Sequence, residues 1–473
     1  MSVITFNIDT HSKEPIYMQI YDYICAEIRS GNLRPGDRLP STRQLSVHLQ
    51  VSRNTVDMAY GQLNAEGYIE SRPKQGYYIC DITNHIPAIF PSDAPAIPPS
   101  PRPASPSSVC FDFNPNGIDL EYFPYNIWKK TMKDILYNDS QDNLLLPGDP
   151  QGDLGLRQAI AGYLHQSRGV RCDASQVIVG AGTDFLLILL YQLLGAKAVY
   201  AVENPGYFQA YQVLSHIGAS TVPVSMDGSG IHMDDLYHSG ASVAYVMPSH
   251  HFPTGIVMPI KRRLELLAWA GNCPDRYIIE DDYDSEFRYK GRPIPSLQGI
   301  DTSGHVIYMG TFSKALTPAM RVGYMVLPPS LLSRYRQQLS FYSSSVSRSE
   351  QKFLTLFIRR GQFERHLNRM RNVYKEKRDY ILKAFQPYRQ FLTISGENSG
   401  LHMLLHFKDG RTTTQLLSQA AEQGIRLYQV SDYSMDTRSS SAFDDHIILG
   451  YAALPMDQLE TGLSRLLDVW FAS

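Results

Sequence analysis

The chain has 473 residues, of which 43% are hydrophobic and 19% are charged, and its formal net charge at pH 7 is −2. This length exceeds what one ordinary hydrophobic core supports, so two or more domains are expected. A nearly neutral chain has no overall field that would draw it to nucleic acid or to an anionic membrane. Any such attraction must therefore be local.

Cysteine usage and hydropathy indicate where the protein works. The five cysteines are scattered and include no C-x-x-C pair, which argues against zinc ribbons and disulfide frameworks, predicts no metal site and fits a reducing cytoplasm. The first residues lack the basic and apolar regions of a signal peptide. The most apolar run, FLLILLYQLLGAKAVYAV, contains Gly195 and Lys197 and breaks too early to span a bilayer. It predicts a buried helix that leads into a strand, and no membrane partner is expected.

The first 80 residues contain three helical patterns and a hairpin pattern. Isoleucines at every fourth position form one apolar stripe between Pro15 and Gly31. STRQLSVHL predicts a second helix capped by Ser41, and SRNTVDMAYGQLNAEG predicts a third that ends at Gly67. YIESRPKQGYYI predicts two short strands around a tip with proline and glycine. This order is typical of a winged helix-turn-helix.

A local basic stripe lies in this region, with four arginines and one acidic residue, Asp37, between Arg34 and Thr55. In a helix-turn-helix, the start of the second helix faces base edges in the major groove. Arginine suits guanine, asparagine suits adenine, and hydroxyl groups suit phosphates. An ordinary helical domain with a solvated basic face would show the same pattern. The candidate DNA contacts are Arg43, Ser52, Arg53, Asn54 and Thr55, with Arg72 and Lys74 at the hairpin tip.

Residues 13–80 resemble the winged helix of GntR-type bacterial regulators. The resemblance lies in EPIYMQI, GNLRPGDRLPSTRQL, VSRNTV and LNAEG. It implies a domain over residues 1–80 that binds double-stranded DNA, with Arg43, Ser52, Arg53, Asn54 and Thr55 as its contacts.

A proline-rich segment follows this domain. Residues 86–108 contain eight prolines, which fix φ and lack backbone donors, so the segment favours extended polyproline II. We predict a linker over residues 81–108 and a second domain over residues 109–473. The alternative is a proline-rich loop within a single domain.

The second domain alternates apolar runs with helical stretches such as KRRLELLAWA. The runs are QVIVG, AVYAVE, VAYVMP, RYIIEDD and VIYMGT. This alternation predicts an α/β fold with a mostly parallel sheet and helices on both faces.

Candidate binding residues follow several of these strands. QVIVGAGTDFLL predicts a strand, a glycine-rich turn and a helix, and the amides of Ala181, Gly182 and Thr183 suit a phosphate at the helix end. Tyr207 follows another strand, where its ring would stack on a flat cofactor. Glycine-rich turns and core tyrosines are both common, so neither feature alone indicates a cofactor.

Two further strand ends carry charged and hydroxyl groups. IIEDDYDSEF leaves carboxylates and Tyr283 at a strand end, where a carboxylate could protonate a pyridine nitrogen and a phenol could bond a ring oxygen. GTFSKALTPAMR offers phosphate ligands and the amine of Lys314, which would form an imine. Each of these features alone has a structural explanation, and only their joint order suggests a site.

That joint order resembles the fold-type I pyridoxal 5′-phosphate (PLP) enzymes of the aspartate aminotransferase group, from about Phe111 to the C-terminus. The resemblance implies a smaller C-terminal α/β subdomain and a homodimer. It makes Lys314 the Schiff-base lysine, Asp281 the partner of the pyridinium nitrogen, Tyr283 the partner of the phenolic oxygen and Tyr207 the stacking ring. It assigns the phosphate to Ala181, Gly182, Thr311, Ser313 and Arg321.

A GntR-type winged helix, a linker and an aminotransferase-like domain in one chain resemble the MocR/GabR regulators. GDPQGDLGLRQAIAGYLHQSRGV, EDDYDSEFRY and GTFSKALTPAMRVGY carry this resemblance. It implies a cytoplasmic transcriptional regulator, not an enzyme, that senses PLP or an amino compound forming an aldimine with it. The alternatives are a true aminotransferase with an added DNA-binding domain and a cofactor-free dimerisation scaffold.

Three departures from the aminotransferase pattern bear on turnover. Phe252 stands where those enzymes carry the asparagine of N-P-T-G, so one contact to the phenolic oxygen is missing. HIILGYAAL lacks the arginine that holds an α-carboxylate, although Arg426 or Arg438 could approach. Gln209 stands where the GABA-responsive relative has a carboxylate-binding arginine. These changes affect cofactor binding less than amino-acid turnover.

Overall fold

The computed structural model describes residues 8–9, 12, 14–82, 109–138, 144–291, 294–435 and 443–471. The chain divides into two compact units, Met1–Ser105 and Pro106–Ser473. Most of the predicted linker, residues 83–108, lies outside the described residues, so its extent remains a prediction. Within the described ranges, no helix is long and apolar enough to cross a membrane.

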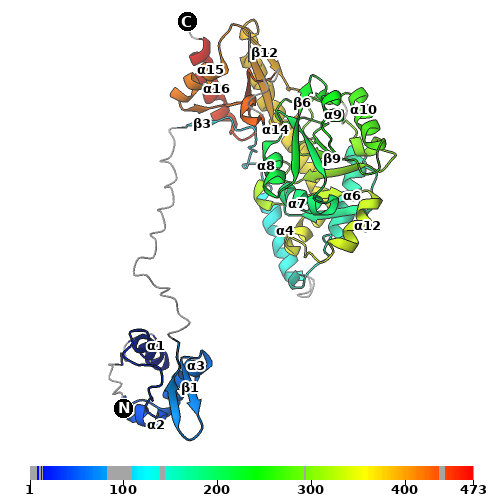
Figure 1. Cartoon of the computed structure of the whole chain (residues 1–473). Helices are drawn as coiled ribbons and strands as arrows, with labels where there is room; N and C mark the ends of the chain where they lie inside the picture. Colours follow the sequence, from blue (N-terminus) through cyan, green and yellow to red (C-terminus); the bar gives the residue numbers. More distant parts are fainter. Residues whose placement is uncertain are drawn as a thin grey trace. The chain divides into compact units, whose positions relative to one another are not determined.

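The N-terminal unit is a winged helix (Figure 1), which confirms the predicted order of elements. It consists of α1 (Ile16–Arg29), α2 (Thr42–His48), α3 (Arg53–Ala65), β1 (Ile69–Arg72) and β2 (Gly76–Ile79). The two strands pair in antiparallel fashion as the wing. The predicted isoleucine stripe is buried against α3, whose Val56, Tyr60 and Leu63 complete the core.

Serine caps determine where α2 and α3 begin. Ser41 Oγ accepts from the Gln44 amide at 3.2 Å, and Gln44 Oε1 accepts from the Ser41 amide at 3.0 Å. Ser52 Oγ accepts from the Thr55 amide at 3.1 Å. Each cap stabilises its helix by about 1 kcal/mol, because it satisfies amides that have no partner within the helix. The Ser52 cap fixes the start of α3, the helix predicted to contact bases.

The second unit is built on an eight-stranded sheet with the order β4-β11-β10-β9-β8-β5-β6-β7. Its strands are β4 (Val177–Gly180), β5 (Val199–Asn204), β6 (Ser220–Asp227), β7 (Gly230–Ile231), β8 (Val243–Val246), β9 (Tyr277–Asp282), β10 (Val306–Thr311) and β11 (Gly323–Val326). The central pairs are parallel, whereas β7 and β11 run against their neighbours. The predicted mostly parallel sheet is confirmed.

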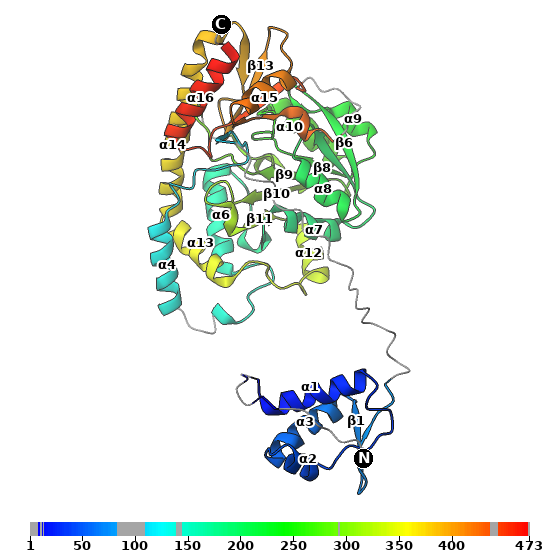
Figure 2. The ribbon, with the colours of Figure 1, turned by 90° about the vertical axis from the view of Figure 1, so that its left-hand side faces the viewer.

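Helices cover both faces of this sheet, as predicted. Alternate residues of β4 show the division, because Ile178 packs with one set of helices and Val177 and Val179 with another. One face carries α7 (Thr183–Leu194), α8 (Phe208–His216) and α12 (Pro329–Gln338). The other face carries α6 (Leu154–Arg168), α9 (Met233–His238), α10 (Ile260–Gly271), α11 (Leu297–Ile300), α13 (Arg348–Arg359) and α14 (Gln362–Ala384). Figure 2 shows α4 (Tyr125–Asn138) beside α13.

A smaller α/β subdomain ends the chain, as the resemblance implied. Its antiparallel sheet has the order β12-β13-β16-β15 and is formed by β12 (Leu392–Ser395), β13 (His402–Phe407), β15 (Tyr428–Gln429) and β16 (His446–Gly450). Helices α15 (Thr413–Glu422) and α16 (Met456–Phe471) pack beside it. The first strand of the unit, β3 (Phe111–Asp112), pairs with β14 (Ile425–Arg426). The segment after the predicted linker is therefore tied to this subdomain.

Candidate functional site

The predicted site residues follow the carboxyl ends of neighbouring parallel strands. Asp281 lies at the end of β9 and Thr311 at the end of β10, while Tyr207 comes three residues after β5. Polar residues at this edge of an open α/β sheet form its usual binding crevice. The sheet thus brings together groups that are distant in sequence.

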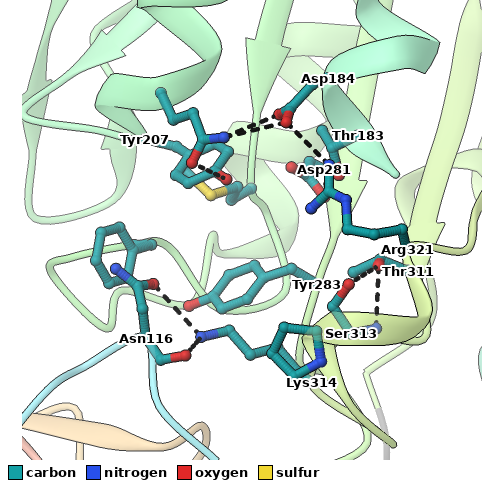
Figure 3. A pocket seen from close by; sticks show the side chains of 14 residues that line it. Asn116, Thr183, Asp184, Tyr207, Asp281, Tyr283, Thr311, Ser313, Lys314 and Arg321 are labelled. Atoms are coloured by element: carbon teal, nitrogen blue, oxygen red, sulfur yellow. Dashed lines mark hydrogen bonds and ion pairs between the residues drawn. The ribbon is translucent and has the colours of Figure 1, made fainter. Parts of the chain in front are cut away.

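They line one cavity of about 240 Å³ (Figure 3). Its walls comprise Asn116, Thr183, Asp184, Tyr207, Gln209, Met247, Phe252, Asp281, Tyr283, Thr311, Ser313, Lys314, Pro318 and Arg321. The predicted residues Tyr207, Asp281, Tyr283, Thr311, Ser313, Lys314 and Arg321 all belong to it. Asn116, Asp184, Met247 and Pro318 were not predicted from the sequence.

Lys314 is half-buried and extends toward Asn116 (Figure 3). Its Nζ donates to the Asn116 carbonyl oxygen at 2.7 Å and lies 3.4 Å from Asn116 Oδ1. Burial lowers the pKa of Lys314 to about 8, although the Asp284 carboxylate opposes this fall. About a tenth of this amine is therefore neutral at pH 7, and the neutral form is the nucleophile toward an aldehyde.

Asp281 is a buried carboxyl group, with 4% of its surface exposed. Burial raises its pKa to about 7, a hydrogen bond from the Tyr245 hydroxyl lowers it, and the carboxylates of Asp282 and Asp284 raise it. A buried carboxyl group needs a charged partner to ionise fully, and a protonated ring nitrogen in the cavity would supply one. The site thus fits a pyridine ring.

Tyr283 lies beside Lys314, and its hydroxyl is 3.1 Å from His250 Nδ1. The same His250 nitrogen lies 2.9 Å from an oxygen of Asp284. Burial and the nearby carboxylates raise the pKa of Tyr283 well above its usual value. Tyr283 therefore remains a protonated donor at any physiological pH.

A hydrogen-bonded chain links Tyr207 to Arg321 across the cavity (Figure 3). The Tyr207 hydroxyl donates to Gln209 Oε1 at 3.2 Å, and Gln209 Nε2 donates to Asp184 at 3.1 Å. Arg321 Nη2 donates to Asp184 Oδ2 at 3.0 Å. The side-chain amide of Gln209 therefore uses both its oxygen and its nitrogen in this chain of hydrogen bonds.

The predicted phosphate amides have acceptors within the protein. The Ala181 amide donates to Ser345 Oγ at 3.0 Å, and the Gly182 amide to the Gly180 carbonyl at 2.8 Å. Both residues adjoin Arg321. Arg321 Nη2 donates to the Ala181 carbonyl oxygen at 3.4 Å, and an added Cβ on Gly182 would lie 2.9 Å from the same nitrogen. The Thr311 and Ser313 hydroxyls are 2.9 Å apart. Arg321, these two hydroxyls and the start of α7 could hold a phosphate, whereas the roles of Ala181 and Gly182 remain predictions.

The predicted DNA contacts lie on the surface of the winged helix. Arg43, Ser52, Arg53, Asn54, Arg72 and Lys74 are exposed, and Thr55 is half-buried. Ser52 and Thr55 also bond each other through their hydroxyls at 2.7 Å, so they serve the helix cap as well. Arg53 Nε lies 3.6 Å from Asp57. Exposed pairs of this kind are weak, so Arg53 can leave Asp57 for a base or a phosphate.

Of the two arginines that could approach an effector carboxylate, Arg426 does not line the cavity. Arg426 stacks its guanidinium over the Tyr428 ring at 5.3 Å, and Arg438 lies outside the described residues. Among the described residues that line the cavity, the cationic side chains are Lys314 and Arg321.

Comparisons with known proteins agree with both parts of the chain. The family model for bacterial regulatory proteins of the gntR family matches residues 16–79, and the model for aminotransferase class I and II matches residues 114–466. The kynurenine aminotransferase of Pyrococcus horikoshii has the fold of the second unit, with a TM-score of 0.65 and 22% identity over 77% of this chain and 91% of that chain.

Several relatives match nearly the whole chain. The HTH-type transcriptional regulator YhdI of Bacillus subtilis is 37% identical over 99% of this chain and 98% of its own. A protein of Rhizobium meliloti named "Probable rhizopine catabolism regulatory protein MocR" is 33% identical, covering 98% and 96%. The pyridoxine biosynthesis regulator PdxR of Corynebacterium glutamicum is 29% identical, covering 98% and 97%.

The two family models and the relatives that match the full length of the chain lead to the same conclusion. The chain belongs to the MocR group of HTH-type transcriptional regulators, in which a GntR-family DNA-binding domain is joined to an aminotransferase-like domain.

Proposed function

We propose that this regulator binds PLP at Lys314 and adjusts its DNA binding to the occupancy of that site. The observation that carries the proposal is the cavity in which a lysine of lowered pKa, a buried carboxyl group and an arginine converge. PLP carries an aldehyde, a pyridine nitrogen and a phosphate, which are the three groups that such a cavity would hold. Adding PLP to the purified protein should give a visible Schiff-base band, with one PLP bound per chain. A protein that stays colourless would contradict the proposal.

In this proposal, each group of residues that lines the cavity binds one part of PLP. Lys314 bonds the aldehyde carbon, and Asp281 keeps the ring nitrogen protonated. Tyr283 donates to the phenolic oxygen, and Tyr207 lies against the ring. Thr311, Ser313 and Arg321 hold the phosphate, together with the turn at Ala181 and Gly182.

PLP itself is our proposed effector. The two cationic side chains that line the cavity in the described structure, Lys314 and Arg321, are both committed to the cofactor. A carboxylate buried without a charged partner is strongly disfavoured, so an amino acid would be held poorly. The relative PdxR is named for pyridoxine biosynthesis, which agrees with a PLP signal. The alternative effector is an amino compound that reacts with bound PLP.

We also propose that the protein works in the cytoplasm as a homodimer. The second unit exposes large apolar side chains, among them Leu120, Tyr125, Leu136, Tyr137, Leu145, Leu146, Leu154 and Phe341. Exposed apolar surface of this extent favours a protein partner, and a second copy would cover it. Two copies also bring two winged helices to one DNA site.

Asn116 offers a path from the cavity toward the DNA-binding domain. It lies seven residues after Val109, where the described chain resumes beyond the predicted linker. Lys314 Nζ donates a hydrogen bond to the Asn116 carbonyl oxygen. When Nζ bonds to an aldehyde carbon, it loses protons that it could donate in this hydrogen bond. Occupancy of the cavity therefore alters the anchoring of the segment that continues into the linker.

Replacing Arg53 by alanine tests the assigned reading helix. If Arg53 contacts a base through two hydrogen bonds, Arg53→Ala should cost about 1–3 kcal/mol at a specific site. The measurement is the dissociation constant for a site that the wild type selects from random DNA, compared with the constant for unrelated DNA. Specific binding should weaken more than non-specific binding.

Lys74 provides the matched control. It lies at the tip of the wing with φ of +62° and is expected to reach a phosphate or the minor groove. Lys74→Ala should therefore weaken specific and non-specific binding to similar extents. Unchanged affinity of Arg53→Ala for the selected site would refute the role given to α3.

A further inference from the structure

A buried histidine–carboxylate pair lies beside the cavity and contacts Tyr283. His250 comes four residues after β8, Asp284 comes two residues after β9, and their side chains are 1% and 2% exposed. His250 Nδ1 lies 2.9 Å and 3.1 Å from the two Asp284 oxygens and 3.1 Å from the Tyr283 hydroxyl. The imidazole and phenol rings stack, with an interplanar angle of 28°. One nitrogen thus joins a carboxylate to the tyrosine.

The role of each group depends on which His250 nitrogen carries the proton. The tautomer with its proton on Nδ1 can donate to the Asp284 carboxylate, because an ionised carboxylate can only accept. In that tautomer the Tyr283 oxygen can accept from the N–H, which turns its own proton away from Asp284, the other group that its hydroxyl contacts, and toward the cavity that it lines. His250 Nε2 is buried and has no partner among the described residues, as suits the nitrogen that carries no proton in this tautomer.

Gly400 of the smaller subdomain closes over the pair. Its φ is +75°, and an added Cβ would lie 1.9 Å from His250 Cε1 and 2.8 Å from Asp284 Oδ2. Its carbonyl accepts from the hydroxyls of Tyr289 and Tyr451, each at 2.7 Å. Glycine is therefore required here, and the close approach keeps water from the pair.

We propose that His250, oriented by Asp284, is a positioning residue that turns the Tyr283 proton toward the phenolic oxygen of PLP bound at Lys314. This inference rests on the proposed function. Phe252, which lines the same cavity, carries no donor to share the task. Without His250, the Asp284 carboxylate would be free to take the Tyr283 proton for itself.

Other titratable groups surround Tyr283. Asp281 and Asp282 precede it on β9, and their carboxylates raise its pKa, as that of Asp284 does. His402 of β13 packs its ring 5.2 Å from the His250 ring, and burial lowers the pKa of His402 to about 3, so this ring is neutral. Lys314 completes the set and is the group whose protonation the experiment follows.

The test is a pH titration of the visible Schiff-base band. A hydrogen bond to the phenolic oxygen stabilises its negative charge and so weakens the hold of the Schiff-base nitrogen on its proton. Loss of this bond should raise the midpoint by about one to two pH units, because a hydrogen bond to a charged group contributes about 1.5–3 kcal/mol and one pH unit corresponds to about 1.4 kcal/mol. We expect this rise in Tyr283→Phe and in His250→Phe, with no further rise in the double variant.

Two variants separate positioning from packing. His250→Asn places an amide N–H near the position of Nδ1 and should keep the wild-type midpoint. His402→Phe removes an equally buried histidine that bonds the Pro253 carbonyl instead of Tyr283, and it should also leave the midpoint unchanged. If His250→Phe does not fold, His250→Gln replaces it, since its longer amide reaches past the Nδ1 position and should give the same rise.

The outcomes distinguish this inference from the proposed function. A wild type that forms no visible band with PLP would overturn the proposed function. A wild type with a band whose midpoint rises in Tyr283→Phe, but not in the folded His250→Phe or His250→Gln variant, would overturn the positioning role of His250 alone.

Discussion

Lys314→Ala should abolish the visible band that PLP gives with the wild type. The variant lacks the amine that bonds the aldehyde carbon, while Asp281, Tyr283 and Arg321 remain. PLP should then bind without a covalent bond and be removed by dialysis. The measurement is the absorption spectrum before and after dialysis, with the released PLP quantified.

Lys314→Arg is the matched control, because it keeps a positive charge but cannot form a Schiff base. It should be colourless as well, which would assign the band to the amine itself and not to the charge. A visible band that survives in Lys314→Ala would place the reactive lysine elsewhere and contradict the assignment of the cavity.

Lys377→Met should destabilise the second unit by about 3–5 kcal/mol, the usual cost of breaking a buried ion pair. Lys377 Nζ donates to Asp119 Oδ2 at 2.6 Å and to the carbonyls of Ala452 and Leu454, and both charged side chains are 2% exposed. The variant leaves the Asp119 carboxylate buried without its partner. The three tryptophans all lie in this unit, so their fluorescence follows its unfolding in denaturant.

Lys375→Met is the control for this experiment, since Lys375 is exposed on the same helix. It should change the free energy of unfolding by less than about 0.5 kcal/mol. A double variant in which Asp119 is also made apolar should recover stability, because the lone charge is then gone. Equal midpoints for Lys377→Met and Lys375→Met would show that the pair contributes no stability.

Much of the fold could be predicted from local patterns. The isoleucine period, the Ser41 and Ser52 positions and the apolar runs of the sheet depend on neighbouring residues, and the structure has helices and strands at those places. The cavity was partly predictable for a related reason. Parallel strands place their carboxyl ends at one edge, so residues such as Asp281 and Lys314 meet whatever lies between them in sequence.

The contacts between distant segments could not be predicted in this way. Asn116 and Lys314 are 198 positions apart, and their contact depends on how β3 is tied to β14. Tyr245 has the sequence pattern of a core strand residue, and only the structure shows its hydroxyl on Asp281. His250 and Asp284 lie on separate loops, and a side chain at position 400 would collide with both, so their contact also depends on the glycine there.

The most direct test of the account is the affinity for the selected DNA site, measured for the protein alone, with PLP, and with PLP plus a panel of amines and amino acids. A ligand can shift this equilibrium only if it binds the two states with different affinities. We predict that PLP alone changes the dissociation constant for this DNA site by about 5–150-fold, the usual range for allosteric coupling between two binding sites. The amino compounds should change it little further. An affinity that PLP leaves unchanged and that only the amino compounds alter would contradict PLP as the signal.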